Sequence, residues 1–496
     1  MSFLKPITRS FIYLARISIL LFAISLCRCS SAPEIRLNDG IVEESMKDIT
    51  GITTDDVSRV SHKEELSLDD LYILAVERTE RLAIKNEAME QASAQKSKAI
   101  AGFLPTLSYV YNKFYSVPGH TPQPTLTENI RKYNAYQSGD ATAFLPSSSS
   151  YSALPPTVGA GSRLLLSIPL TNGISAYNDY RAAKMLIEER KLEAKHEAGR
   201  LYLEIAQGYF NFLQLAESVK SSEESFRLQT EIVKERRRLY SLGRIMRSEL
   251  LSSETDLSNS EATLTDTKFQ LEQVRSALAL MVGLKEEVRL ADFKVILPPV
   301  PMSIDPDGFI SKRFDVLSAG KSVKVAEANQ DKAKVGFLPN IAVNNYYSFP
   351  VHGQARNKDV IVQLAVTVPL TPLSAAADIK MAESASKQAK LQESLIRRTA
   401  TQEIRNAFES FQNSEKLLRI YEKAFQLAKQ TSGSQAANYQ SGRSSKIEAI
   451  LSKLAMINSE TIYKRMIHQH TLNRIALGVS IGEIPQIPSE KKGSGE

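Results

Sequence analysis

The residues of this sequence best suited to chemistry are its histidines and its adjacent carboxylates. Six histidines occur, and His468 and His470 stand two positions apart, so that in a helix they would not share a face. The pair Glu188 and Glu189 falls within a long helical pattern that implies no pocket. Neither a Cys/His cluster with metal-ligand spacing nor a glycine-rich phosphate loop is present. We therefore predict no catalytic, cofactor-binding or metal-binding residues and no enzymatic activity.

The two cysteines, Cys27 and Cys29, indicate processing rather than a disulfide. They directly follow an apolar stretch at residues 17–26, which is too short to span a membrane and comes after a basic region, as in an export signal. Residues 24–27 (Ile-Ser-Leu-Cys) resemble a bacterial lipoprotein box, in which the cysteine becomes the acylated first residue, although Leu26 is larger than such boxes prefer. Lipidation of Cys27 is one prediction, and ordinary cleavage with incidental cysteines is the alternative.

The composition limits the ways in which the chain can meet a membrane or nucleic acid. Charged residues make up 24% of the 496 residues and the mean hydropathy is −0.21. No stretch beyond the N-terminal region approaches the roughly 20 apolar residues of a spanning helix, so any membrane crossing must use strands. The net charge of +7 comes from Lys and Arg interspersed with Glu along helical runs, which favours a solvated surface over a nucleic-acid site.

A four-residue stretch that occurs twice organises the chain. Gly-Phe-Leu-Pro at residues 102–105 ends a helical run and opens an alternating segment, and the same residues return 234 positions later at 336–339. A second apolar segment ending in proline follows each copy, at 167–170 (Ser-Ile-Pro-Leu) and 367–370 (Thr-Val-Pro-Leu). A period of two predicts four strands: from Thr106, over Arg163–Leu170, around 340–344 and over 360–368.

Long runs without proline follow each pair of predicted strands. From about Gly173 to Tyr240, apolar residues at spacings of four and three predict a helix of about 100 Å. After a break at residues 240–244, leucines recur at every seventh position, which predicts a second helix folded back antiparallel beside the first. These leucines are Leu250, Leu257, Leu264, Leu271 and Leu278.

The repeat extends over these helices, because matching residues recur 199 positions apart. Tyr240, Gly243, Arg244 and Glu249 are matched by Tyr439, Gly442, Arg443 and Glu448. The predicted organisation is a signal peptide at 1–26, an irregular N-terminal tether at 27–65, a first repeat at 66–284, a linker at 285–305, a second repeat at 306–483 and a C-terminal tail at 484–496.

Four strands are too few to close a barrel. An open sheet with alternating faces would leave both edges exposed, which lipid does not tolerate. Oligomerisation resolves this conflict, since three copies would bring about 12 strands, enough for a closed barrel with a wet interior. The long helices would then continue the wall as a tube.

The order of helix, two strands and helix pair, doubled and joined by these Gly-Phe-Leu-Pro junctions and Tyr-x-x-Gly turns, resembles the TolC family of outer membrane efflux proteins over roughly residues 66–483. The resemblance implies a mainly α-helical chain with a membrane β-barrel and two helix-strand-strand-helix repeats. It also implies a homotrimer with a 12-stranded barrel in outer-membrane lipid, an α-helical periplasmic tunnel and an equatorial belt. Its implied partners are a periplasmic adaptor (membrane fusion protein) and an inner-membrane pump.

Family members constrict the tunnel at its periplasmic end, where the two helix turns lie. The resemblance assigns to that region Glu249 of the first copy and Tyr439, Arg443 and Glu448 of the second. Three copies of Glu448 around one axis would form an acidic ring selective for cations; an ordinary solvated helix charge is the alternative. Leu451 stands where one family pattern has a second acid.

The glycines of the two turns, Gly243 and Gly442, are predicted to end helices and to dock an adaptor. We expect a passive channel in the outer membrane, extending into the periplasm, that serves a tripartite efflux or type I secretion system; the cargo stays open. The alternative is a lipid-anchored periplasmic coiled-coil adaptor or scaffold with a small soluble sheet. Adaptors usually interrupt a single helical hairpin, whereas hairpin and strands occur twice here.

Overall fold

The computed structural model describes residues 49–61, 63, 65–113, 133–135, 137, 160–284, 290, 306–349, 360–368 and 373–483. The chain divides into two compact units: the described parts of 1–86, 197–304 and 404–496, and those of 87–196 and 305–403. Each unit therefore combines segments of both repeats. Among the described residues, no helix has both the length and the apolar composition needed to cross a membrane.

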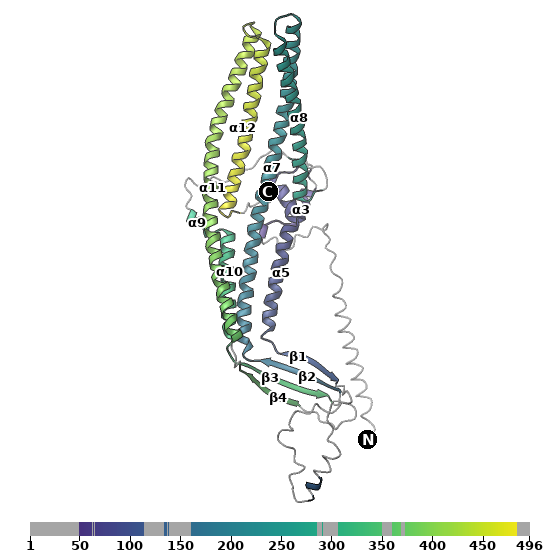
Figure 1. Ribbon diagram of the computed structural model, residues 1–496, viewed down its shortest axis with the longest axis vertical. Helices are drawn as coiled ribbons and strands as arrows, with labels where there is room; N and C mark the ends of the chain where they lie inside the picture. Colours follow the sequence, from purple (N-terminus) through teal and green to yellow (C-terminus); the bar gives the residue numbers. More distant parts are fainter. Residues whose placement is uncertain are drawn as a thin grey trace, which may run out of the picture. The chain divides into compact units, whose positions relative to one another are not determined.

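Strands of both repeats form a single antiparallel sheet (Figure 1), in the order β1 (Thr106–Lys113), β2 (Ala160–Pro169), β3 (Asn340–Phe349) and β4 (Val360–Thr367). The central pairing of β2 with β3, in which Leu165 lies opposite Tyr346, joins the two repeats. All four strands were predicted. The second is longer than expected, because it begins at Ala160 rather than at Arg163.

The helices that lead to and from the sheet are α5 (Glu80–Ala101), α7 (Asn172–Ser241), α10 (Phe314–Val335) and α11 (Leu373–Gln440). Each Gly-Phe-Leu-Pro junction is a tight turn: the N–H of Phe103 donates to the carbonyl of Ile100, and the N–H of Phe337 donates to that of Lys334. A Cβ on Gly102 would come within 3.1 Å of the Ala176 Cβ, so this glycine allows the start of α7 to approach.

Ion pairs connect the helices of this sheet-bearing unit. Lys332 on α10 reaches Asp179 on α7 at 2.7 Å, and Lys390 on α11 reaches Glu327 on α10 at 2.9 Å. The carboxylate of Glu188, one of the adjacent acids noted above, pairs with Lys321 on α10. This ion pair gives Glu188 a structural role.

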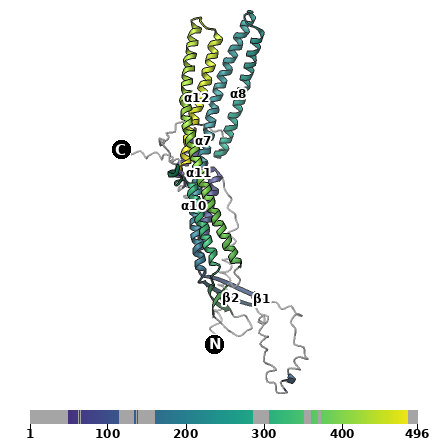
Figure 2. The same ribbon diagram turned by 60° about the vertical axis from the view of Figure 1, so that its left-hand side comes forward.

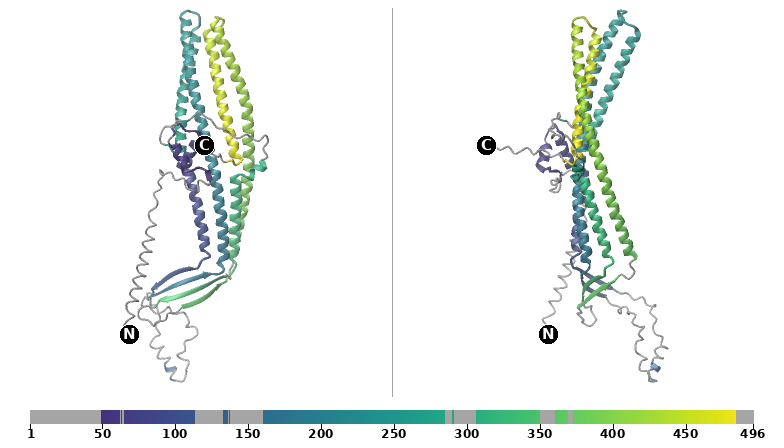
Figure 3. Two further views of the ribbon diagram at one scale, coloured as in Figure 1. Left: turned by 180° about the vertical axis from the view of Figure 1, so that it is seen from behind. Right: turned by 90° about the vertical axis from the view of Figure 1, so that its left-hand side faces the viewer.

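The other unit contains two antiparallel helix pairs, α7 with α8 (Arg247–Val282) and α11 with α12 (Lys446–Ser480) (Figures 2 and 3). Of the leucines of the predicted seam, Leu278 is buried and the other four are half-buried. A Cβ on Gly208 of α7 would lie 3.1 Å from the Leu278 Cδ1. Tyr72 and Tyr202 add an edge-to-face aromatic pair at 5.2 Å.

Two predictions for the N-terminal region were wrong. Residues 54–61 form a helix, α3 (Thr54–Ser61), where irregular chain was expected, because Val57 and Val60 find a buried site. The helical run expected before the Gly-Phe-Leu-Pro at 102–105 is not one helix: it is divided into α4 (Leu68–Arg78) and α5, since Thr79 between them is extended. A short helix, α9 (Pro306–Ile310), precedes α10.

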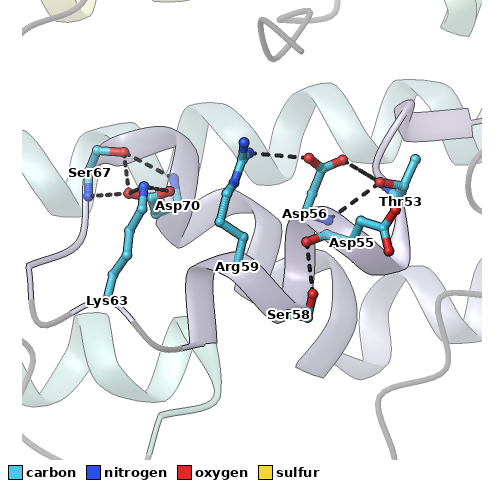
Figure 4. A network of polar contacts seen from close by, with 8 residues as sticks. All are labelled: Thr53, Asp55, Asp56, Ser58, Arg59, Lys63, Ser67 and Asp70. Carbon is cyan, nitrogen blue, oxygen red and sulfur yellow. Dashed lines mark hydrogen bonds and ion pairs between the residues drawn. The ribbon is translucent and has the colours of Figure 1, made fainter. Parts of the chain in front are cut away.

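Polar contacts organise this N-terminal segment (Figure 4). The Ser67 hydroxyl accepts from the N–H of Asp70 at 3.2 Å, and the Asp70 carboxylate accepts from the Ser67 N–H at 3.0 Å, which completes a capping box on α4. Lys63 also donates to Asp70, at 2.8 Å. Within the expected tether, the Asp56 carboxylate accepts from the Thr53 N–H at 3.1 Å at the start of α3, so this acidic residue also caps a helix.

Candidate functional site

The two turns that join the long helices have the same backbone. At the first, the N–H of Gly243 donates to the Tyr240 carbonyl at 2.9 Å and that of Arg244 to the Leu239 carbonyl at 2.9 Å. At the second, Gly442 and Arg443 make the equivalent bonds at 3.0 and 2.8 Å. The glycine φ angles are 69° and 73°, a left-handed conformation that favours glycine. The prediction that these glycines end helices is confirmed.

The helices that leave the turns begin differently. Met246 and Ser445 occupy equivalent positions before α8 and α12, with φ and ψ of −79° and 153° in one and −80° and 156° in the other. Met246 makes no side-chain cap, whereas Ser445 accepts from the Glu448 N–H at 3.1 Å. The Glu448 carboxylate accepts from the Ser445 N–H at 2.9 Å. Glu448 therefore forms part of a capping box, and it is also exposed.

Side chains also close the turns in different ways. At the first turn, Arg236 of α7 donates to the Glu249 carbonyl at 2.7 Å, and Arg237 pairs with Glu254 of α8 at 2.8 Å. At the second, the Ser444 hydroxyl donates to the carbonyl of Gln435, the residue equivalent to Arg236, at 3.3 Å. Arginine side chains therefore connect the two helices at the first turn, and at the second turn a serine hydroxyl bonds back to α11.

Lysines on α12 pair with glutamates on α7 and so connect the two helix pairs. The distances are 3.0 Å for Lys464 to Glu217, 2.8 Å for Lys453 to Glu224 and 3.8 Å for Lys446 to Glu231. Between them lies an apolar cluster formed by Leu228, Ile232, Ile450 and Ile457.

The ion pairs change the acidity of the glutamates. Hydrogen bonds from Arg227 and Lys453 lower the pKa of Glu224 to about 2. Burial raises the pKa of Glu217, but hydrogen bonds from Lys464 and Lys220 outweigh it and leave that pKa below its usual value. Both carboxylates are therefore held in the charged form that the lysines require.

The two histidines of α12 serve packing. His468 lies 5.9 Å from the ring of Phe210 on α7, and His470 stacks on Phe411 of α11 at 4.9 Å with its Nδ1 2.9 Å from the Ser414 hydroxyl. They contact different helices, as their spacing predicted. Burial lowers the pKa of both rings. Within the described part of the chain, no group of three or more His, Cys, Asp or Glu is placed to hold a metal ion.

The sheet has two unlike faces, because residues that lie directly opposite each other in the register point the same way. One face is apolar and largely exposed, and the other carries most of the polar side chains of the strands. The apolar face carries two polar residues, Ser162 and Asn345, among Leu107, Tyr109, Tyr111, Leu164, Leu166, Ile168, Ile341, Val343, Tyr347, Phe349, Val360, Val362, Leu364 and Val366. The polar face includes Thr106, Ser108, Arg163, Ser167, Asn340, Asn344, Tyr346, Gln363 and Thr367.

Some of the predicted site residues lie within the described part of the chain, and others lie outside it. Tyr439 and Arg443 are exposed at the second turn, and Glu249 is exposed at the start of α8, where its carbonyl accepts from Arg236. Cys27 lies outside the described residues, as do Cys29, most of the linker, the C-terminal tail and most of the loop between β1 and β2.

Sequence reasoning missed Ser445 and Arg236. The Ser-x-x-Glu spacing at 445–448 could have revealed the cap. Arg236 had no distinguishing signal, because it is one of three consecutive arginines.

Neither a protein-family model nor a curated protein matches the sequence. Solved structures do match the fold. The Campylobacter jejuni CmeC outer membrane channel is 16% identical with a TM-score of 0.69, over 84% of this chain and 86% of that one. The Vibrio cholerae outer membrane protein VceC is 16% identical with a TM-score of 0.66, over 84% of this chain and 96% of that one. The open state of the Neisseria gonorrhoeae MtrE outer membrane channel is 17% identical with a TM-score of 0.61, over 84% of this chain and 89% of that one.

The chain therefore has the fold of outer membrane channel proteins. The resemblance to the TolC family, which rested on the doubled junctions and turns, is confirmed at the level of the fold.

Proposed function

We propose that three copies of this chain form a passive channel that crosses the outer membrane and extends into the periplasm. The observation that carries the proposal is the four-stranded sheet, which exposes a face that is apolar except for Ser162 and Asn345, with β1 and β4 at its edges. A sheet in water would normally cover such a face and protect its edges. Lipid would cover the face, and pairing of β4 with β1 of another copy would satisfy the edges.

The dimensions of the strands fit this role. They contain 8 to 10 residues, close to the roughly 9–11 of a tilted transmembrane strand. Tyr109, Tyr347 and Phe349 lie together at the end of the apolar face away from the helices, with ring distances of 6.4 and 5.1 Å. Phe103 and Phe337 are exposed at the helix junctions. Aromatic residues at both ends of an aliphatic band are typical of membrane strands.

The helical part suggests the partners. In the proposed trimer the long helices continue the barrel as a periplasmic tunnel, which receives solutes from an inner-membrane pump through a periplasmic adaptor. The turns at Gly243 and Gly442 would dock the adaptor. Glu448 and Glu249, with Tyr439 and Arg443, would line the narrow end of the tunnel. The solved structures with this fold include outer membrane channels. The pump would determine whether the channel serves drug efflux, metal efflux or type I secretion.

Lipidation at Cys27 would add an anchor on the periplasmic side of the membrane. The competing hypothesis, a lipid-anchored adaptor or scaffold, requires a soluble sheet. The exposed valines and leucines of β4, from Val360 to Val366, do not suit such a sheet in water. They favour the channel.

Conductance of the purified full chain in planar bilayers tests the proposal. L364R and Q363R place the same cation on adjacent residues of β4 that face opposite sides of the sheet. A cation facing lipid at mid-depth costs about 2–4 kcal/mol per copy, so L364R should lose pores while Q363R keeps them. An oligomer without conductance, or equal behaviour of the two variants, would contradict the proposal.

A further inference from the structure

The charged residues of the four strands are all basic. The sequences of the four strands contain no Asp or Glu, and their charged residues are Arg163 on β2 and Lys113, the last residue of β1. Arg163 lies within its strand, six residues before Pro169, or about 20 Å along the strand. A single type of charge is therefore built into the middle of the sheet.

Arg163 belongs to the polar face. Its partners across the sheet are Val110 on β1 and Ser348 on β3, and the neighbouring Leu164 points to the apolar face with Tyr109. In the proposed channel the apolar face meets lipid, where an arginine is costly, so the face with Arg163 borders the water-filled interior. Arg163 is exposed, and its guanidinium would be open to ions in transit.

Cross-strand contacts position this guanidinium. The Arg163 Cζ lies 5.4 Å from the ring centroid of Tyr346 on β3, and the Tyr346 hydroxyl donates to the Gln363 Oε1 on β4 at 3.0 Å. The three side chains thus form a row across β2, β3 and β4. A cation over an aromatic ring gains about 0.5–1 kcal/mol at an exposed site and keeps its full charge.

We infer that Arg163, held over Tyr346, makes the strand section of the channel selective for anions, so that negatively charged solutes are favoured there. The inference rests on the proposed function, because three copies around one axis would set three guanidinium groups in the wall of one pore. Rings of arginine or lysine are a known physical basis for anion selectivity. The effect acts over about 10 Å at 0.1 M salt and about 3 Å at 1 M, so it should weaken as salt rises.

Reversal potentials of the full chain in planar bilayers, under a potassium chloride gradient, test this inference. R163Q should lower the chloride-to-potassium permeability ratio by at least about twofold at 0.1 M, and the difference from the wild type should shrink at 1 M. R163K keeps the charge and should stay near the wild-type ratio. R181Q removes one arginine from α7, which pairs with Asp331, and is the matched control for net charge.

The possible outcomes distinguish a failure of the proposed function from a failure of the inference about Arg163. If the wild type forms no pores, the proposed function fails. If it forms pores and R163Q leaves the ratio unchanged, or R181Q changes it equally, the inference fails while the channel stands. Should R163Q not assemble, the wild type itself decides, because its ratio must rise as salt falls from 1 M to 0.1 M. E448Q, which removes the predicted acidic ring, should shift the ratio in the opposite direction from R163Q.

Discussion

The two turns between the long helices share a backbone and differ in the side chains that stabilise it. Equivalent hydrogen bonds close both turns at Gly243 and Gly442, and the next helices start from nearly equal dihedral angles. The second turn is then capped by Ser445, whereas the first has Met246 at that position and relies on Arg236. A repeat can therefore keep one backbone geometry while each copy stabilises it by different chemistry.

Replacing the turn glycines should have the largest effect, and an equal one in both copies. G243A and G442A each place a side chain at positive φ, where L-residues lose about 1–2 kcal/mol, and a Cβ would meet no atom within 4 Å at either site. Hydrogen exchange at the amides of Arg244 and Arg443 should accelerate about 5–30-fold. A large difference between the two variants would show that the turns are not equivalent in energy.

The helix caps should distinguish the turns. S445A removes the hydroxyl that accepts from Glu448 and should destabilise the start of α12 by about 1 kcal/mol. M246S should stabilise α8 by a similar amount, because Glu249 already stands three positions later. Amide exchange over residues 247–254 and 446–453 measures both changes, with M246A as the control that lacks a hydroxyl. If M246S protects α8 no better than M246A, the missing cap does not explain the difference.

The arginine contact of the first turn should have a smaller effect. R236A removes the bond to the Glu249 carbonyl and should cost about 0.5 kcal/mol, since the site is exposed. Combined with M246S, the loss should be more than compensated in the exchange of α8, because the added cap stabilises the helix by about 1 kcal/mol. The matched variant Q435A at the second turn keeps the backbone carbonyl that accepts from Ser444, and its exchange should match the wild type.

The helices and strands were accessible from the sequence because their patterns are local. The period of two, the seven-residue spacing of Leu250 to Leu278 and the prolines of the junctions each act within a few residues. The alternation along each strand predicted one apolar and one wetter face. The cross-strand register is not local, so the row of Arg163, Tyr346 and Gln363 was not predicted. For the same reason the compact units, which mix both repeats, do not follow from the order of elements along the chain.

The positions of the two turns were predicted from the sequence, whereas the side-chain contacts around them were not. Glycines at the turns have a backbone requirement that sequence reveals. Glu448 was interpreted by its charge alone, and the contribution of its carboxylate to the cap depends on Ser445 three residues earlier. The prediction that Glu448 lines the tunnel stays a prediction, and E448Q tests it by ion selectivity.

The ion pairs between α7 and α12 offer the finest test, because they join the two helix pairs whose turns differ. Glu224 has its pKa lowered from 4.5 to about 2 by Arg227 and Lys453. A carboxylate with a lowered pKa stabilises the folded state above pH 4.5, and that contribution disappears as the pH falls from 4.5 toward 2. The protection of α12 amides near Lys453, meaning their exchange rate relative to the intrinsic rate at each pH, should therefore decrease over this range in the wild type.

E224Q removes the titrating group, so the protection of its α12 amides should be weaker at neutral pH and should depend less on pH between 4.5 and 2. E223Q is the matched control, since Glu223 pairs with Lys268 on α8 rather than with α12, and it should keep the wild-type profile near Lys453. Equal profiles for E224Q and the wild type would mean that the apolar cluster around Leu228 and Ile450 holds the helix pairs together without help from the ion pairs.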